Sequence, residues 1–251
     1  MDGVPDGVSG ERDSHLGGRG EPRRYPAPRS VAPLALLLGL GAAVAFGVLG
    51  EEIQDSEPVV VDTGASQFLH GYANPPLDTA MQLASFLGSA FFVIPVLALV
   101  ALLLLRRRRL GEAVFLSTAY AGSGALNYLL KLAFHRMRPA LPWSPGVQDY
   151  SFPSGHSMNS FVFYMGLAVV AWLVLGRRAG IVAMVGGVLI VLLVGVSRVY
   201  LGYHYVSDVL GGFAAGLLWL VIWAVAFPAI WARVRTRLGL GRAVDPNLPA
   251  N

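Results

Sequence analysis

Three short segments of the sequence combine histidine, serine, aspartate and basic side chains at spacings that suit chemistry on a phosphate group. The segments cover residues 131–139 (KLAFHRMRP), 153–156 (PSGH) and 197–208 (SRVYLGYHYVSD). Basic side chains bind phosphate oxygens, and one guanidinium can hold two oxygens at once. A neutral imidazole can attack phosphorus and form a covalent intermediate. The three segments are therefore candidates for parts of one phosphate-handling site.

His204 and Asp208 in the third segment are four residues apart, so on a helical turn the carboxylate would reach the imidazole. Asp208 would then hold the proton on one ring nitrogen and leave the other free to attack phosphorus. In a hydrolase triad a carboxylate orients the histidine that acts as the base, and here the oriented histidine would itself be the nucleophile. Taken alone, the pair could equally be a surface contact worth about 0.3–0.5 kcal/mol. Arg198, six residues before His204, would add a cation for the phosphate.

Lys131 and Arg138 in the first segment are seven residues apart, which on a helix is about two turns and the same face. Pro139 would then stop that helix. Two fixed cations pointing one way suit a phosphate. The plainer alternative is that both side chains extend along the end of a membrane helix toward water.

The second segment reads as a helix start, where Ser154 can cap the helix and the backbone N–H groups of the first turn are free. Such a start binds anions readily. Gly155 would let the backbone approach a ligand closely, and His156 could give a proton to a leaving oxygen. In isolation the tetrapeptide is also an ordinary helix start with an interfacial histidine.

Composition indicates that a membrane holds these segments. Of the 251 residues, 55% are hydrophobic and 14% are charged, which is too little polar surface for a soluble globule of this size. The chain has no cysteine, which excludes disulfides, thiolate nucleophiles and cysteine-ligated metal sites. The net charge is +4, but the basic residues lie in short runs at the ends of apolar segments, so no nucleic-acid partner is expected.

Six uncharged apolar stretches predict an all-α integral membrane protein built as a bundle of six transmembrane helices. They cover residues 31–50, 79–105, 113–130, 157–176, 179–197 and 209–232, and most reach the ~20 residues that a membrane-crossing helix needs. The third reaches that length if its helix continues through Lys131 to about Phe134. The predicted membrane domain covers residues 31–235, between a disordered tail at 1–30 and a second tail at 236–251. A cleaved signal peptide is the alternative for the first stretch, and we favour a retained helix because its removal would put the termini on opposite sides.

Basic residues also predict the orientation of the bundle. Of 19 Lys and Arg residues, all but four fall in the N-terminal tail, between spans two and three, between spans four and five, or after span six. Cytoplasmic loops concentrate such residues, so both termini are predicted to be cytoplasmic. The four exceptions are Lys131, Arg136, Arg138 and Arg198, which lie in the first and third segments. All three segments are thus predicted to meet at the extracytoplasmic face, where phosphate binding would explain the exceptions.

Together the three segments resemble the type 2 phosphatidic acid phosphatase superfamily, whose motifs are K-x6-R-P, P-S-G-H and S-R-x5-H-x3-D. All three motifs occur here complete and in order. The resemblance covers Lys131 to Asp208 closely and, through the six-span architecture, most of the chain beyond residue 30.

The resemblance implies a role for each matched residue. Lys131, Arg138 and Arg198 would hold the phosphate, assisted by Ser154 and the backbone N–H of Gly155. His204 would attack phosphorus, Asp208 would orient it, and His156 would protonate the leaving group. The family needs no metal or other cofactor, and the site segments offer only Asp149 and Asp208 as carboxylates, fewer than a two-metal site requires. The pattern assigns no role to His135 or Arg136, and Tyr200, Tyr203 and Tyr205 are predicted to be interfacial belt residues.

Three functional interpretations follow. The first is a metal-independent lipid phosphate phosphatase of the cell membrane, acting at the exterior leaflet on phosphatidic acid, phosphatidylglycerol phosphate or a polyprenyl (di)phosphate through a phosphohistidine. The second is a phosphotransferase that passes the group to an acceptor other than water. The third is a transporter or lipid-binding protein whose polar residues line a path. The partners expected are the lipid substrate and membrane lipids, and the sequence leaves the substrate and the oligomeric state open.

Overall fold

The computed structural model describes residues 28–54 and 60–238, and within these ranges every regular element is an α-helix. The helices are α1 (Pro28–Gln54), α2 (Val60–His70), α3 (Pro75–Leu87), α4 (Ala90–Arg106), α5 (Leu110–Phe134), α6 (Gly155–Leu175), α7 (Arg177–Tyr200) and α8 (Val206–Arg237). The all-helical class is therefore confirmed for the described residues. Most of the two predicted tails, residues 1–27 and 239–251, lies outside them, and α1 begins three residues before the predicted membrane domain.

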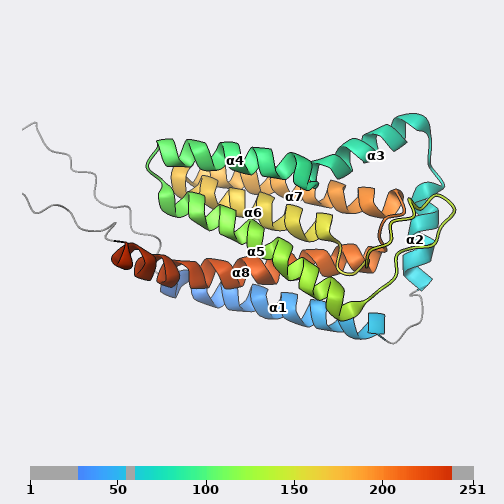
Figure 1. Ribbon diagram of the computed structural model, residues 1–251, viewed down its shortest axis with the longest axis horizontal. Helices are drawn as coiled ribbons and strands as arrows, with labels where there is room; N and C mark the ends of the chain where they lie inside the picture. The colour runs from blue at the N-terminus through green and yellow to red at the C-terminus, as the bar shows by residue number, and fades with distance from the viewer. Residues whose placement is uncertain (1–27, 55–59, 239–251) are drawn as a thin grey trace, which may run out of the picture.

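Long helices run side by side along the molecule, with α6 in contact with α5, α7 and α8 (Figure 1). Helix α1 lies along α8 at one edge of the bundle, and α4 packs on α5. The short helix α2 crosses one end of the bundle. The start of α1 and the end of α8 lie together at the other end.

The described residues contain four helices long and apolar enough to cross a membrane, namely α1, α6, α7 and α8. The predicted second span consists of two helices, α3 and α4, which are bent by 45° and together qualify as a fifth. The bend has a local cause, because Gly88 ends α3 and the Ser89 side chain caps the first turn of α4. Helix α5 has 25 residues but carries polar Ser117, Thr118, Ser123 and Asn127 in its middle, and it is not among these spans.

The core of the bundle centres on α6, whose Met158, Val162 and Phe163 side chains are fully buried. Two glycines let α8 approach the start of α6. A Cβ on Gly211 would stand 2.2 Å from the Phe152 ring, and one on Gly212 would stand 2.8 Å from the backbone oxygen of Ser154. The first turn of α8 is therefore held tightly against the residues that open α6.

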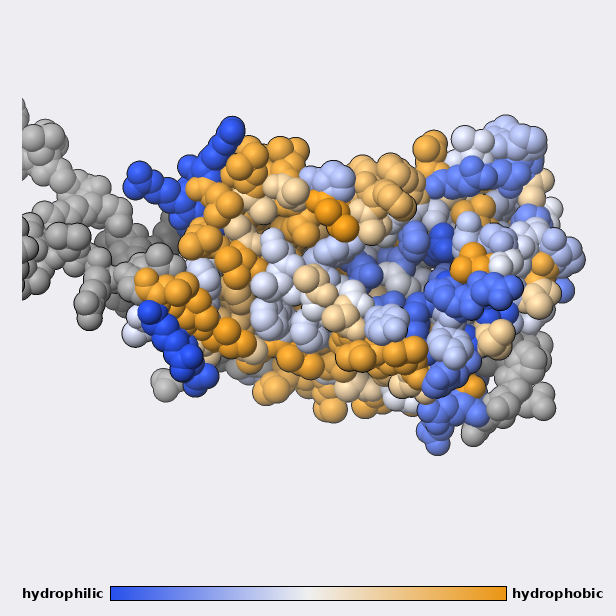
Figure 2. Space-filling view, viewed as in Figure 1, coloured by the Kyte–Doolittle hydropathy of each residue, from blue (hydrophilic) through white to orange (hydrophobic). Residues whose placement is uncertain are grey.

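Hydrophobic residues cover most of the visible flank of the bundle, and hydrophilic residues gather at the end that carries α2 and the segment between α5 and α6 (Figure 2). Helix α5 ends at Phe134, as the span-length argument required, and His135 follows in the left-handed region with φ 49°. The prediction that one helix carries both Lys131 and Arg138 is therefore wrong. The chain turns at His135 and brings the two side chains together from a helix end and an irregular segment.

Candidate active site

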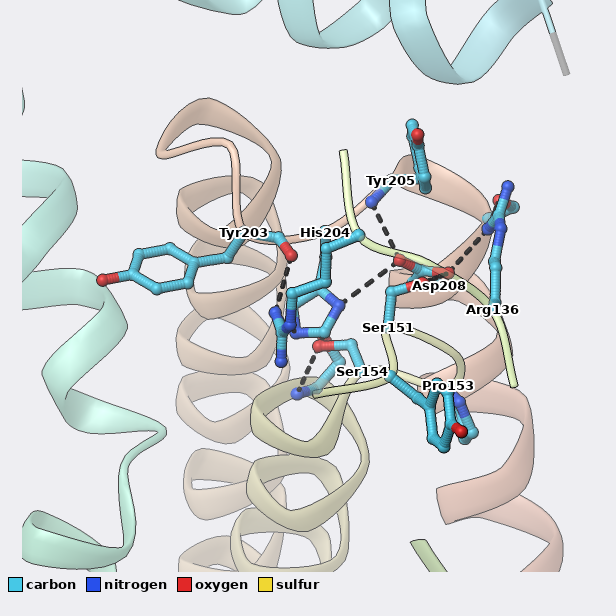
Figure 3. Close-up of polar contacts among 12 residues, drawn as sticks. Arg136, Ser151, Pro153, Ser154, Tyr203, His204, Tyr205 and Asp208 are labelled. Atoms are coloured by element: carbon cyan, nitrogen blue, oxygen red, sulfur yellow. Dashed lines mark hydrogen bonds and ion pairs between the residues drawn. The ribbon is translucent and has the colours of Figure 1, made fainter. Parts of the chain in front are cut away.

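The three sequence segments meet at the polar end of the bundle, where backbone hydrogen bonds form between and within the chain segments of the site. The Ser154 N–H donates to the Asp208 carbonyl at 2.9 Å, which joins the start of α6 to the start of α8. The Ser151 N–H donates to the Arg136 carbonyl at 2.8 Å, and the His204 N–H donates to the Arg198 carbonyl at 3.2 Å. These bonds fix the positions from which the candidate side chains project (Figure 3).

His204 and Asp208 lie side by side, as predicted. The imidazole Nδ1 is 3.3 Å from Oδ2 of Asp208, and the two side chains are almost wholly buried. The helix α8 begins only at Val206, so His204 precedes it and the contact is not the helical i, i+4 pair of the sequence argument. The same Oδ2 accepts the backbone N–H of Tyr205 at 3.0 Å, which anchors the carboxylate at the helix start.

The other ring nitrogen of His204 faces a cation. Its Nε2 lies 3.2 Å from Nη1 of Arg138, which also donates to the Tyr203 carbonyl at 2.7 Å. A guanidinium can only donate, so this contact assigns Nε2 as the acceptor and Nδ1 as the nitrogen that carries the proton toward Asp208. The lone pair on Nε2 therefore points at the group that would hold a phosphate.

Lys131 and Arg138 converge on one carboxylate. Oδ1 of Asp149 accepts from Nε of Arg138 at 2.6 Å, and Oδ2 lies 3.4 Å from the Lys131 ammonium. The ammonium also donates to the Tyr150 carbonyl. The Asp149 side chain is 54% exposed, whereas both cations are 13% exposed. An anion can thus be held between these two cations at the edge of the site.

Arg198 comes to the site from the last turn of α7 and is 5% exposed. Its Nη1 donates to the Ser85 hydroxyl of α3 at 2.6 Å, and its guanidinium carbon lies 3.8 Å from the centre of the Tyr203 ring. Nε of Arg198 has no hydrogen-bond partner among the described residues. A buried guanidinium with a spare donor is suited to an anionic ligand.

The start of α6 supplies the remaining predicted residues. Ser154 is the N-cap of the helix, as expected, and its hydroxyl accepts the Ser157 N–H at 3.4 Å. Gly155 is required by a close approach, since a Cβ there would stand 2.9 Å from Oδ1 of Asn127. His156 is half-buried in the first turn of α6. The structure thus gathers all eight predicted residues at one end of the bundle.

Two charged residues at the site were not assigned a role from the sequence. Arg136 donates through Nη1 to Oδ1 of Asp208 at 2.6 Å and through Nη2 to Oδ2 of Asp62 at 2.8 Å. The motif treats Arg136 as variable, and Asp62 lies 146 residues before Asp208 in the chain. The position of Arg136 against the charge rule was the only sequence signal for this cluster.

The three tyrosines predicted to be interfacial belt residues make contacts inside the protein. Tyr200 is buried, and its hydroxyl donates to Oδ1 of Asp78 at 2.6 Å. Tyr203 covers Arg198, and the Tyr205 ring lies 4.4 Å from the guanidinium carbon of Arg136. Tyr203 and Tyr205 thus each pack against a cation of the site, and their placement in an interfacial belt stays a prediction.

The electrostatics of the site favour a neutral imidazole between charged neighbours. Burial lowers the pKa of His204 to about 4, even though Asp208 acts in the opposite direction. Burial acts to raise the pKa of Asp149, but Arg138 and Lys131 outweigh it and hold the pKa below its usual range. At neutral pH the site therefore contains an uncharged His204 next to the cations of Lys131, Arg138 and Arg198.

The chain is similar to proteins whose activities are known. The model of the PAP2 superfamily matches residues 112–232. Phosphatidylglycerophosphatase B of Bacillus subtilis (strain 168) is 32% identical over 179 residues, which are 69% of this chain and 86% of that protein. Undecaprenyl-diphosphatase BcrC of the same organism is 31% identical over 37% of this chain and 46% of its own length. The crystal structure of a transmembrane PAP2 type phosphatidylglycerolphosphate phosphatase from B. subtilis matches with a TM-score of 0.69 and 29% identity, covering 76% of this chain and 96% of that one.

Proposed function

The chain belongs to the PAP2 superfamily, and from that premise we propose that it is a lipid phosphate phosphatase that works through a phosphohistidine on His204. Membership and the relatives make it a phosphoric monoester or diphosphate hydrolase, and its apolar helices make it a multi-pass membrane protein. The proposed phosphohistidine adds the chemical step by which the phosphate leaves the lipid.

The observation that carries the proposal is the position of the His204 ring. Its Nδ1 faces Asp208 at 3.3 Å and its Nε2 faces Arg138 at 3.2 Å. A nucleophile held by an orienting carboxylate on one side, and aimed at a phosphate-binding cation on the other, has the arrangement that covalent catalysis needs.

In the proposed reaction the substrate phosphate displaces Asp149 from Lys131 and Arg138 and also takes the spare donor of Arg198. The Ser154 side chain and the Gly155 N–H at the start of α6 add donors for its oxygens. Nε2 of His204 bonds to phosphorus while the bond from phosphorus to the leaving oxygen breaks. That oxygen takes a proton from His156.

A water molecule completes the cycle. It attacks phosphorus and gives a proton to His156, and the Nε2–phosphorus bond breaks to release inorganic phosphate. No metal is needed in this scheme, because three cations offset the phosphate charge. Asp208 stays paired with Arg136 and His204, and Asp149 gives up its two cations to the phosphate.

The membrane arrangement is part of the proposal. We place residues 31–235 as a six-span domain, with α3 and α4 forming one bent span and α5 another. Both termini, including the tails at 1–30 and 236–251, are cytoplasmic, and the site opens at the exterior leaflet of the cell membrane. The substrate is a lipid phosphate or diphosphate, and the other partners are membrane lipids rather than nucleic acid.

The experiment is a phosphate-release panel with the purified protein in detergent and excess EDTA. It compares phosphatidic acid, lysophosphatidic acid, phosphatidylglycerol phosphate and undecaprenyl diphosphate, with His204→Ala as the inactive variant. Release of phosphate from at least one lipid by the wild type alone is expected. Failure on every lipid would contradict the proposal, and substrate loss without matching inorganic phosphate would indicate transfer to another acceptor.

A further inference from the structure

A buried carboxylate from outside the three motifs contributes to the site. Asp62 lies in the first turn of α2, the helix that crosses the polar end of the bundle, and is 1% exposed. Its Oδ1 accepts the backbone N–H of Ser207 at 2.9 Å, and its Oδ2 accepts the Ser207 hydroxyl. Asp62 is therefore held by the same turn of α8 that carries Asp208.

Arg136 connects the two carboxylates. It bonds Oδ2 of Asp62 at 2.8 Å and Oδ1 of Asp208 at 2.6 Å through different nitrogens of one guanidinium, and its side chain is only 12% exposed. The Ser207 hydroxyl lies 2.7 Å from the same guanidinium. A planar fork that bridges two fixed carboxylates has little freedom to move, so Oδ1 of Asp208 is fixed on the side away from His204.

The negative charge of Asp62 also acts on His204. If Arg136 faced Asp208 alone, the pair would be neutral, and the attraction of Asp208 for a proton on His204 would be largely cancelled. With Asp62 present, the three ions carry one net negative charge. Their charges interact strongly because the cluster is withdrawn from water.

That negative charge matters most when His204 bonds to phosphorus, because the ring then acquires positive charge while its Nδ1–H still faces Asp208. We propose that Asp62 is a positioning residue for this step: through Arg136 it holds the Asp208 carboxylate in place and keeps its charge available to His204. The inference rests on the function proposed above. It makes α2, a helix outside the matched family region, part of the machinery of the site.

The competing explanation is that Asp62 only fastens α2 to the bundle. Asp62→Asn separates the two, since the amide keeps the size and one acceptor oxygen but removes the charge. The matched control is Asp78→Asn, the same chemical change on α3, where Asp78 accepts the hydroxyl of Tyr200. Each variant is assayed for phosphate release on the lipid that the wild type hydrolyses, with folding checked by gel filtration and thermal unfolding.

We expect Asp62→Asn to lower kcat roughly ten- to a hundredfold, the range for losing a group that orients a metal-bound histidine, and to leave KM nearly unchanged. Asp78→Asn keeps a kcat close to that of the wild type. The double variant Asp62→Asn/Arg136→Gln, which returns the net charge near His204 to that of the wild type, recovers part of the lost kcat. A purely structural role predicts the opposite, because the double variant removes a further anchor.

A wild-type kcat in a folded Asp62→Asn protein overturns the inference, and a double variant slower than the single one overturns the part of it that rests on charge. If Asp62→Asn does not fold, Asp62→Glu and Asp62→Gln form a second pair that differ only in charge, and equal kcat values overturn it in the same way. Each of these outcomes presupposes an active wild type and an inactive His204→Ala. Loss of either of those would count against the proposed function instead.

Discussion

Nε2 of His204 and Nη1 of Arg138 lie 3.2 Å apart, so the proposed nucleophile and a proposed phosphate-binding cation are in contact. The contact keeps the lone pair of Nε2 pointed toward the place where phosphorus would lie. It also means that Arg138 must turn its donor from nitrogen to phosphate oxygen as the substrate binds. Substitutions of the residues around this contact test their roles one at a time.

Removal of the nucleophile tests the mechanism most directly. His204→Ala is expected to reduce phosphate release to background while the protein stays folded, because no other imidazole of the described residues lies between Asp208 and Arg138. His135→Asn is the matched control, since His135 has no motif role and asparagine tolerates its left-handed backbone. Labelled phosphate should be trapped on the acid-quenched wild type and absent from His204→Ala. A wild-type rate in His204→Ala would refute the phosphohistidine.

Loss of the orienting charge should be less complete. Asp208→Asn keeps a side chain of the same size but cannot hold the proton on Nδ1 of His204 in the same way, so kcat should fall roughly a hundredfold or more. The nucleophile remains, so activity should stay above that of His204→Ala. Steady-state kinetics on the same lipid compare the two variants, and an unchanged rate would remove Asp208 from the mechanism.

The protonation of His204 should differ from that of an exposed histidine. Burial lowers its pKa to about 4, compared with about 6.5 in an unfolded chain. The unfolded chain then takes up the proton first, so His204 makes the fold less stable as pH falls from about 6.5 toward about 4. Activity should fall only as pH approaches the lower value, because protonation removes the attacking lone pair.

NMR titration of protein labelled in its histidine rings measures this pKa directly, with His204→Ala to assign the signal. A midpoint near 4 is expected for His204. A midpoint near that of free histidine would show that burial does not control its protonation.

Asp149 pairs with Lys131 and Arg138, two of the cations that we propose bind the substrate phosphate. Its carboxylate lies 2.6 Å from Arg138 and 3.4 Å from Lys131, so it competes with the phosphate for both. Asp149→Asn should therefore lower KM and the inhibition constant of inorganic phosphate by about two- to fivefold, a modest effect because exposed ion pairs are weak. Asp149→Glu, which keeps the charge, is the control. A higher KM in Asp149→Asn would show instead that Asp149 helps to position the cations.

The sequence predicted those parts of the fold that depend on continuous local patterns. The apolar stretches at 157–176, 179–197 and 209–232 match α6, α7 and α8 within a few residues, and Ser154 caps α6 as its type and position suggested. The alternation of spans also placed the three motifs at one end, which is where the structure has them. Such features need only chain order and side-chain type.

The parts that could not be predicted depend on contacts between distant residues or on one backbone angle. The left-handed φ of His135 ends α5 before Arg138, and no periodic pattern in the sequence predicts that turn. Asp62 reaches Arg136 across 74 positions, from a helix whose short amphipathic sequence gave no signal. The cluster became visible only when the packing of α2 was known.

The close approach of α8 to α6 gives a prediction about stability and activity together. A Cβ on Gly212 would stand 2.8 Å from the Ser154 carbonyl oxygen and 3.2 Å from the Met158 nitrogen. These are backbone atoms, which cannot rotate away as the end of a flexible side chain can. Gly212→Ala should therefore cost about 1–3 kcal/mol of stability by overpacking. It should also lower activity, because it separates Asp208 from the start of α6, to which its carbonyl is bonded at 2.9 Å. Gly186→Ala on α7 is the control, since its Cβ would meet no atom within 4 Å. Thermal unfolding in detergent and phosphate release measure the two effects, and wild-type values for Gly212→Ala would show that α8 can move away from α6 without cost.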